Sequence, residues 1–384
     1  ALPSEGRGRE FESRRVRQFS FRPFPLAASP CADDPVPVSP MFRVIAVNAG
    51  LVAAGLVAAE LLFGTWLFGP SFGALNLPRD MVRRFDVSAL RPADGPVLYS
   101  RDRWGLRGRY ASPATIGVLA VGGSTTNEMY VSDGETWTER LESRLAEAGI
   151  LLSVVNAGAE GQSTLGHIRN FDTWFALIPD LKFRYLLAYI GVNDMALGPR
   201  GADPIQAAYD RSESPERLRR LRQYAANHSA LYRLWRILRG MREASIAKVG
   251  HARIDHAGAS WIEAPDLAVA LPADSGDLAG RLEGYRTRVI ELVRRTRARG
   301  AEAIVVTQTR SNWRREGGRL LFAARADGAP DTAGYIETTL FNRAAMAACA
   351  EAGAICLDLG AEIEFRPGDF YDHVHTTPAG SARV

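Results

Sequence analysis

Five short apolar runs, each long enough for a single strand, are separated by longer segments after residue 115. Parallel strands that are buried on both faces have this nearly continuous apolar character, and helices usually connect them. The sequence therefore predicts an α/β fold in which helices cover both faces of a five-stranded parallel sheet. The runs are Ile116 to Val121, Leu152 to Val155, Tyr185 to Ile190, Ala303 to Thr307 and Ala354 to Leu357.

Helical periodicity appears between these runs. Trp137, Leu141 and Leu145 recur at four-residue spacing, and Gly149 follows as a plausible C-terminal cap. A second helix is predicted from about Leu282 to Arg299. These helices would supply the layers that cover the sheet.

More than 100 residues separate the third run from the fourth. A connection of that length should contain structure of its own, so we predict a helical insertion at about 195–280. Its nine arginines between Arg211 and Arg242 alternate with leucine and aromatic residues, which is a basic amphipathic pattern. The pattern fits either a solvated helix pair packed on the core or a lid or membrane-surface contact.

The chain before residue 111 divides into three parts. Residues 1–40 are rich in Arg, Pro and Ser and are interpreted as a disordered extension; because the first methionine is Met41, whether they are native is left open. Residues 41–69 are predicted to form a membrane anchor, and the proline-containing residues 70–110 a linker. The catalytic domain is then expected over 111–384.

The anchor prediction rests on an apolar stretch from Val44 to Phe68, which is long enough to cross a bilayer. Glu60 keeps open the alternative of a buried or interfacial helix. Basic residues lie on both sides of the stretch, so counting them does not favour an extracytoplasmic catalytic domain. They are Arg43 before it, and Arg79, Arg83 and Arg84 after it.

Composition excludes some functions. The net charge is only +4 and the arginines are dispersed, so nucleic-acid binding has little support. The cysteines Cys31, Cys349 and Cys356 lack the CxxC spacing of a zinc site. Cys349 and Cys356 are expected to be buried as small apolar residues in preference to forming a disulfide.

Candidate catalytic residues follow the apolar runs, where a parallel sheet places its ligands. Ser124 follows the first run in Gly-Gly-Ser-Thr, and Gly161 follows the second in a glycine-containing turn. Asn193 follows the third run in Gly-Val-Asn-Asp, and its amide can donate to an oxyanion. These turns are individually common, so their combination carries the prediction.

The segment after the last run contains Asp372 and His375, three residues apart. His375 would act as general base toward Ser124, and Asp372 would hold the imidazole in the required tautomer. The alternative is a metal site made by Asp372, His373 and His375, but no further His or Cys cluster supplies the remaining ligands.

In this order the four blocks resemble those of the SGNH (GDSL-like) hydrolase superfamily, with Ser124, Gly161, Asn193 and His375 as the block residues. The resemblance implies a flavodoxin-like three-layer α/β/α fold, with no metal or organic cofactor. The first block departs from Gly-Asp-Ser-Leu, which leaves the substrate class open. The family usually continues with a long helix after its last block, so the end at Val384 is interpreted as a truncation.

The sequence thus predicts a single-pass, membrane-anchored serine esterase with the triad Ser124, Asp372 and His375 and an oxyanion hole formed by Ser124, Gly161 and Asn193. Similar anchored members suggest an extracytoplasmic catalytic domain. Its substrate would be an ester-bearing small molecule, lipid or carbohydrate, including O-acetyl esters. The alternatives are an O-acyltransferase that acts on cell-envelope carbohydrate and a catalytically silent, membrane-tethered scaffold.

Overall fold

The computed structural model describes residues 40–67, 72, 77–197, 224, 228–246, 253–254, 258–264, 277–325 and 327–384. The extension expected over 1–40 lies outside these residues except for Pro40. The chain divides into two units, residues 1–54 and residues 55–384.

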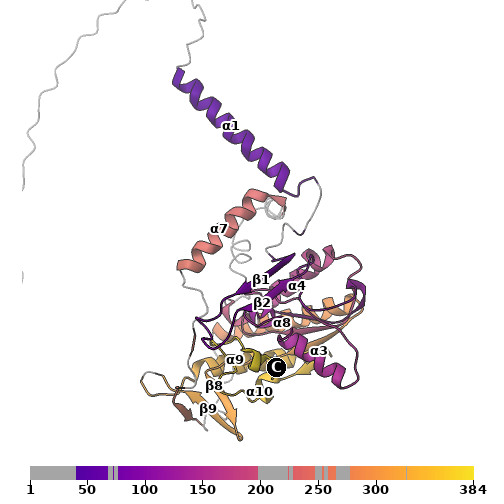
Figure 1. The fold of residues 1–384 in the computed structure, drawn as a ribbon, viewed down its shortest axis with the longest axis vertical. Helices are drawn as coiled ribbons and strands as arrows, with labels where there is room; N and C mark the ends of the chain where they lie inside the picture. The colour runs from indigo at the N-terminus through magenta and orange to yellow at the C-terminus, as the bar shows by residue number, and fades with distance from the viewer. Residues whose placement is uncertain are drawn as a thin grey trace, which may run out of the picture. The chain divides into compact units, whose positions relative to one another are not determined.

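Helix α1 (Pro40–Phe63) is an uninterrupted apolar helix with no buried residue (Figure 1). Its length and composition are sufficient to cross a membrane. The helix therefore satisfies the length requirement of the predicted anchor.

The centre of the second unit is a five-stranded parallel sheet with the order β10-β7-β5-β3-β4. In chain order this is the flavodoxin-like arrangement, in which the first strand lies between the second and the third. The prediction of a five-stranded parallel sheet is confirmed. The strands are β3 (Ile116–Gly122), β4 (Val154–Asn156), β5 (Phe183–Tyr189), β7 (Glu302–Val306) and β10 (Ile355–Leu357).

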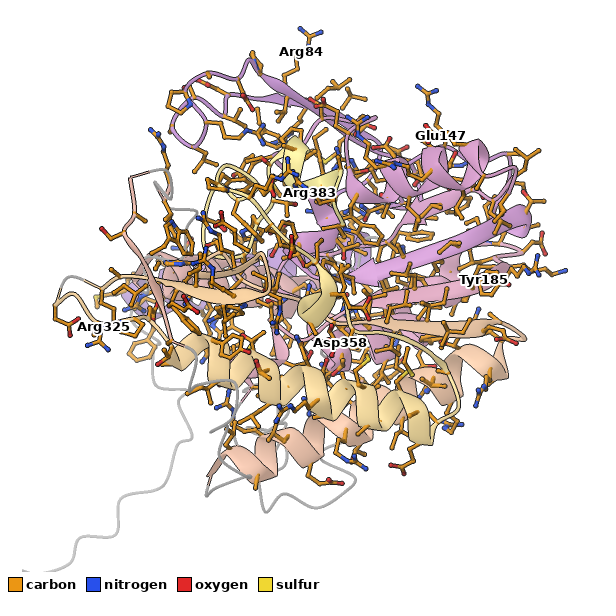
Figure 2. All side chains as sticks on the ribbon, turned by 90° about the horizontal axis from the view of Figure 1, so that it is seen from below. Arg84, Glu147, Tyr185, Arg325, Asp358 and Arg383 are labelled. Atoms are coloured by element: carbon orange, nitrogen blue, oxygen red, sulfur yellow. A yellow bond between two sulfur atoms is a disulfide. The ribbon has the colours of Figure 1, made fainter. Side chains whose placement is uncertain are left out.

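Alternate residues of each strand face opposite layers, because successive side chains of a strand point to opposite faces. On one face Val118 and Ala120 of β3 pack with Trp137 of α3. On the other face Leu119 and Val121 belong to the larger core that includes α4, α8 and α9. Figure 2 shows α3, which ends at Glu147, and the pair α8 and α9 on opposite sides of the sheet.

Two of the helices that form the layers were predicted from periodicity. Helix α3 lies where it was predicted, and α8 begins at Asp277, before the predicted start at Leu282, and ends close to the predicted end. Helix α3 begins with a capping box, in which the side chains of Thr136 and Glu139 each accept the backbone N–H of the other residue. Gly149 follows the helix with φ +77°. Outside the insertion, the described helices of the domain are α2 (Ser124–Asn127), α3 (Trp137–Glu147), α4 (Thr164–Thr173), α8 (Asp277–Ala298), α9 (Ala333–Glu351), α10 (Leu359–Glu362) and α11 (Pro378–Ser381). Short 3-10 turns are η2 (Pro113–Thr115), η3 (Phe175–Leu177) and η4 (Asp194–Ala196).

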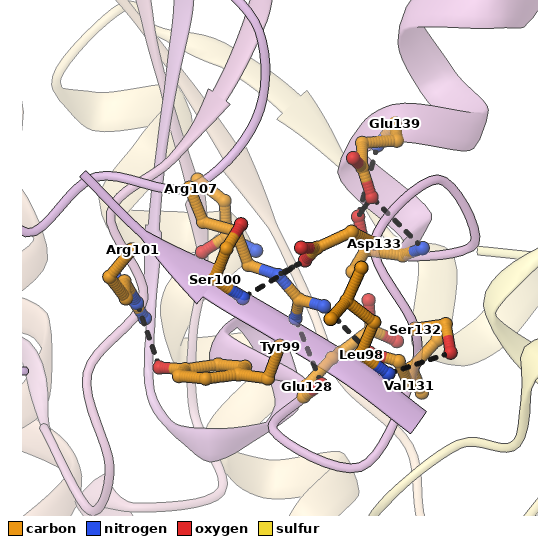
Figure 3. Close-up of polar contacts among 12 residues, drawn as sticks. Leu98, Tyr99, Ser100, Arg101, Arg107, Glu128, Val131, Ser132, Asp133 and Glu139 are labelled. Carbon is orange, nitrogen blue, oxygen red and sulfur yellow. Dashed lines mark hydrogen bonds and ion pairs between the residues drawn. The ribbon is translucent and has the colours of Figure 1, made fainter. Parts of the chain in front are cut away.

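The segment expected to be a linker over 70–110 is corrected where the structure describes it. Strands β1 (Met81–Phe85) and β2 (Val97–Arg101) form an antiparallel pair, and Leu106 belongs to the main core. The buried guanidinium of Arg107 also enters the domain (Figure 3). It donates to the carbonyls of Asn127, Glu128 and Val131 and pairs with Asp133 at 2.8 Å. The linker prediction rested on the prolines of this segment, which carry no information about these contacts.

The insertion expected to be helical over 195–280 is corrected in its described part, which contains both a helix and a strand. Helix α7 (Ala230–Ile246) exposes Leu234, Trp235 and Leu238. Strand β6 (Trp261–Glu263) instead joins a second sheet with β8 (Trp313–Glu316) and β9 (Arg319–Ala323), in the order β6-β9-β8. A three-residue strand carries too little periodicity to be recognised in the sequence.

Cys349 and Cys356 form a disulfide. This corrects the expectation that they are buried as unpaired apolar residues. Cys349 lies near the end of α9 and Cys356 on β10, and the turn between these elements brings their Cα atoms to 5.9 Å.

We expect Arg107→Met to lower the free energy of unfolding by about 3 to 5 kcal/mol, because it leaves three buried carbonyls and a carboxylate without their cationic donor. Urea denaturation followed by circular dichroism measures the change. Arg109→Met, at an exposed arginine two residues away, is the control and should have little effect. Equal stabilities of the two variants would contradict the importance assigned to Arg107.

Candidate active site

The nucleophile candidate lies on a sharp turn between β3 and the short helix α2. Gly123 precedes Ser124, which is the first residue of α2 and is half-buried. A Cβ on Gly123 would lie 1.9 Å from Nδ2 of Asn193, so no larger residue fits there. The glycine therefore permits the close approach of the Asn193 amide to the turn that carries Ser124.

Ser124, His375 and Asp372 form a hydrogen-bonded chain. Ser124 Oγ lies 2.7 Å from His375 Nε2, and His375 Nδ1 lies 2.7 Å from Asp372 Oδ2. This chain connects residues 251 positions apart in the sequence. The structure thus brings together the three side chains that the sequence selected.

The carboxylate of Asp372 is held by its own loop. Its Oδ1 accepts the backbone N–H groups of Val374 and His375, at 2.9 and 2.8 Å. The ring of Tyr371 stacks on the imidazole, with centroids 5.7 Å apart and planes 13° from parallel. Oδ2 thus remains available to the imidazole, which places a proton on Nδ1 and leaves Nε2 to accept from Ser124.

The two further candidates lie at the same edge of the sheet. Asn193 Nδ2 donates to the carbonyl of Gln162 at 2.9 Å, which fixes its amide beside Gly123. Gly161 adopts φ +66°, in the left-handed region that favours glycine, and no atom lies within 4 Å of the position a Cβ would take. A side chain on residue 161 would project into this open space.

The described residues contain no group of three or more His, Cys, Asp or Glu side chains that could hold a metal ion. His373, a member of the alternative metal set, is exposed, whereas Asp372 is buried. Asp372 bonds to His375, and His375 bonds to Ser124, which is the arrangement expected of a nucleophile and its base.

Residues 120–383 match the family of GDSL-like lipases and acylhydrolases, over more than half of the chain. The chain belongs to this family. It is therefore an ester-bond hydrolase, as the resemblance to the SGNH superfamily implied. A search of curated proteins found no match.

The GDSL-like hydrolase is also similar to solved structures. One is TesA, with 16% identity, a TM-score of 0.37, and coverage of 70% of this chain and 92% of the other. AlinE4, an SGNH-hydrolase family esterase, has 15% identity, a TM-score of 0.35, and coverage of 70% and 87%. A variant of Axe2, an acetyl xylan esterase from Geobacillus stearothermophilus, has 13% identity, a TM-score of 0.35, and coverage of 70% and 91%.

Behind the Asn193 turn of the hydrolase lies a buried ion pair that sequence reasoning did not assign. Asp194 accepts from both the N–H and the hydroxyl of Thr164 and pairs with Arg288 at 3.0 Å. Thr164 begins α4 directly after the Gly161 turn, so this cluster joins the two turns that carry Gly161 and Asn193.

Gln308 is a second missed residue. It follows β7, which is the fourth of the predicted apolar runs, and no candidate catalytic residue had been assigned after that run. Its Nε2 donates to Thr125 Oγ1 at 2.7 Å, and its Oε1 accepts from the N–H of Val192 at 2.8 Å. Thr125 and Val192 are the neighbours of Ser124 and Asn193. One side-chain amide thus spans the nucleophile turn and the Asn193 turn, and the position of Gln308 after a strand was the available signal.

Glu128 is the third missed residue, and it is a buried acid near the site. Its Oε2 accepts the N–H of Trp137 at 2.7 Å, and its Oε1 accepts hydroxyl groups of Thr376, at 3.0 Å, and Ser381. The Glu128 N–H in turn caps α2 by donating to the carbonyl of Ser124. Glu128 therefore connects the nucleophile helix with the loop that carries His375. Burial raises the pKa of its carboxyl to about 7.

This pKa gives the hydrolase a specific dependence of stability on pH. The carboxyl ionises near pH 4.5 in the unfolded chain and near pH 7 in the folded protein, so the folded state binds more protons in this window. The stability that Glu128 contributes is therefore complete below pH 4.5 and falls as pH rises to about 7.

We expect Glu128→Gln to lack this fall, because its amide does not titrate. The unfolding free energy of the wild type minus that of Glu128→Gln should decrease by about 3 kcal/mol between pH 4.5 and pH 8. Urea denaturation at a series of pH values measures it, and Glu147→Gln, at an exposed residue of α3, is the control. A difference that does not change with pH would show that Glu128 titrates normally.

Proposed function

We propose that the chain is a serine esterase in which Ser124 is the nucleophile, His375 the general base and Asp372 the residue that orients it. The observation that carries this proposal is the continuous chain of two 2.7 Å contacts from Ser124 Oγ through the imidazole to the Asp372 carboxylate. A hydroxyl next to an oriented imidazole is the arrangement that makes serine nucleophilic near neutral pH.

The reaction proceeds in two steps. Ser124 Oγ attacks the ester carbonyl and forms a C–O bond while its proton moves to His375 Nε2, and that proton then passes to the departing alcohol as the ester C–O bond breaks. Water next attacks the acyl-enzyme and gives a proton to the same nitrogen. That proton passes to Ser124 Oγ as its bond to the acyl carbon breaks, which releases the acid and restores the serine. Asp372 stays ionised and stabilises the imidazolium in both steps.

The oxyanion is bound, in this proposal, by the N–H groups of Ser124 and Gly161 and by the Asn193 amide. The open space at Gly161 and the position of Nδ2 against Gly123 support the assignment. Asn193 uses one amide hydrogen on the Gln162 carbonyl, and an amide nitrogen carries a second. This second hydrogen is the one assigned to the oxyanion.

We also propose that α1 anchors the enzyme in a membrane as a single pass. The Glu60 carboxylate, near the end of α1, accepts the N–H groups of Ala230 and Leu231 at 3.0 Å each. Glu60 thus caps the start of α7, a segment beyond the apolar span. Its carboxylate therefore has hydrogen-bond partners outside the span, so Glu60 no longer argues against a membrane-spanning helix. The exposed Leu234, Trp235 and Leu238 of α7 fit a helix at the membrane surface.

The proposed substrate is a carboxylic ester of a small molecule, a lipid or a carbohydrate, and the proposed location of the catalytic domain is extracytoplasmic. The disulfide between Cys349 and Cys356 supports that location, since disulfides persist in oxidising compartments.

Hydrolysis of p-nitrophenyl acetate tests the proposed esterase activity. Substitution of Asn193 tests the proposed oxyanion hole most directly. We expect Asn193→Ala to lower kcat by about 100-fold to 1,000-fold, because one oxyanion donor is lost. Asn193→Asp, which keeps the side-chain shape but presents a carboxylate that only accepts, should be at least as impaired. Thermal melting confirms that both variants fold. Full activity of folded Asn193→Ala would remove Asn193 from the oxyanion hole.

A further inference from the structure

A cavity lies beside Tyr371, next to the candidate active site. It has a volume of about 790 Å³, within the range of small-molecule sites. Its walls come from the loop between β1 and β2, the loop before α3, the C-terminal loop and the insertion. Neither Ser124 nor His375 lines it. Its charged and aromatic lining residues include Arg91, Asp94, Glu135, Arg253, Phe370 and Tyr371.

Arg91 is the buried charge of this cavity. The residue is 8% exposed, and its Nε lies 2.6 Å from Asp94 Oδ2. Its Nη1 and Nη2 have no hydrogen-bond acceptor among the residues that the structure describes. A guanidinium whose terminal nitrogens are buried without an acceptor is costly, and a carboxylate or phosphate matches the spacing of those two donors.

The other charged groups of the cavity are more exposed. The Asp94 side chain is 40% exposed, and Glu135 is 42% exposed and lies 3.9 Å from Arg140. Arg253, also a lining residue, is exposed. Water therefore screens both acids, whereas the Arg91 charge is buried, so the interior of the cavity favours an anion.

Tyr371 connects the cavity with the triad. Its ring lies 5.9 Å from the Arg91 guanidinium carbon and stacks on the imidazole of His375. The N–H of Ile254, another lining residue, donates to the Tyr371 carbonyl at 3.0 Å, so the insertion holds this wall. A ligand that packs on Tyr371 inside the cavity is thus separated from His375 by one aromatic ring.

We propose that this cavity is an anion site, in which the Nη1 and Nη2 groups of Arg91 bind the carboxylate or phosphate of a small molecule whose apolar part packs on Phe370 and Tyr371. The anion comes either from an acidic ester substrate of the proposed esterase or from a separate molecule. The site itself does not depend on the esterase activity.

Titration calorimetry with inorganic phosphate and with acetate tests the site directly. The full chain should bind at least one of the two anions, and Arg91→Gln should weaken that binding about tenfold or more, because charge-assisted hydrogen bonds are lost. Arg84→Gln, at an exposed arginine of β1, should bind like the wild type (Figure 2). Ser124→Ala should also bind normally, which separates this result from the fate of the catalytic proposal.

Two results would overturn the anion site. One is the absence of phosphate and acetate binding by wild-type protein that melts cooperatively. The other is equal affinity of Arg91→Gln and Arg84→Gln, which would show that the bound anion does not contact Arg91.

The source of the anion follows from kinetics with p-nitrophenyl acetate and the mono-p-nitrophenyl ester of succinate. If the acidic group belongs to the substrate, Arg91→Gln should lower the ratio of kcat/KM for the acidic ester to that for the neutral ester, and Arg84→Gln should not. If that ratio stays unchanged while phosphate still binds through Arg91, the ligand is a separate anion.

Discussion

The parallel register between β3 and β5 is the constraint on which the site depends. Gly122 is paired with Tyr189, so both strands leave the sheet at the same level. Ser124 follows one strand and Asn193 follows the other, which places the proposed nucleophile and the proposed oxyanion donor in the crevice between two neighbouring strands. In the flavodoxin-like strand order this crevice is the topological switch point, where ligands bind in such sheets. The loop that carries Asp372 and His375 completes the site.

Buried polar groups hold these turns in place. Glu128 joins α2 to the loop that carries His375, and Gln308 bonds to Thr125 and Val192, the neighbours of Ser124 and Asn193. Asp194 with Arg288 supports the Gly161 turn. Each of them is satisfied by several partners, which is the condition under which a buried polar network stabilises a single arrangement. His167 belongs to the same support: burial lowers its pKa to about 3, so it is a neutral hydrogen-bonding residue beside Gln162.

The sequence predicted the features that depend on local pattern. The apolar runs gave all five strands of the parallel sheet, and the position of Ser124, Asn193 and His375 after such runs gave the residues that the structure brings together. Features that depend on contacts between distant parts of the chain were not predicted. β1 is mostly exposed and shows no apolar alternation, the disulfide depends on the turn between α9 and β10, and Glu128 and Gln308 gain their partners only when separate turns meet.

The central claim is that Ser124 is activated by His375 and Asp372, and labelling with a fluorophosphonate probe tests it most directly. We predict that the wild-type enzyme reacts covalently at Ser124, that Ser124→Ala does not react, and that Asp372→Asn reacts far more slowly because His375 loses its oriented tautomer. Wild-type protein that is folded but unlabelled, or Ser124→Ala that is labelled as fast as the wild type, would contradict the account.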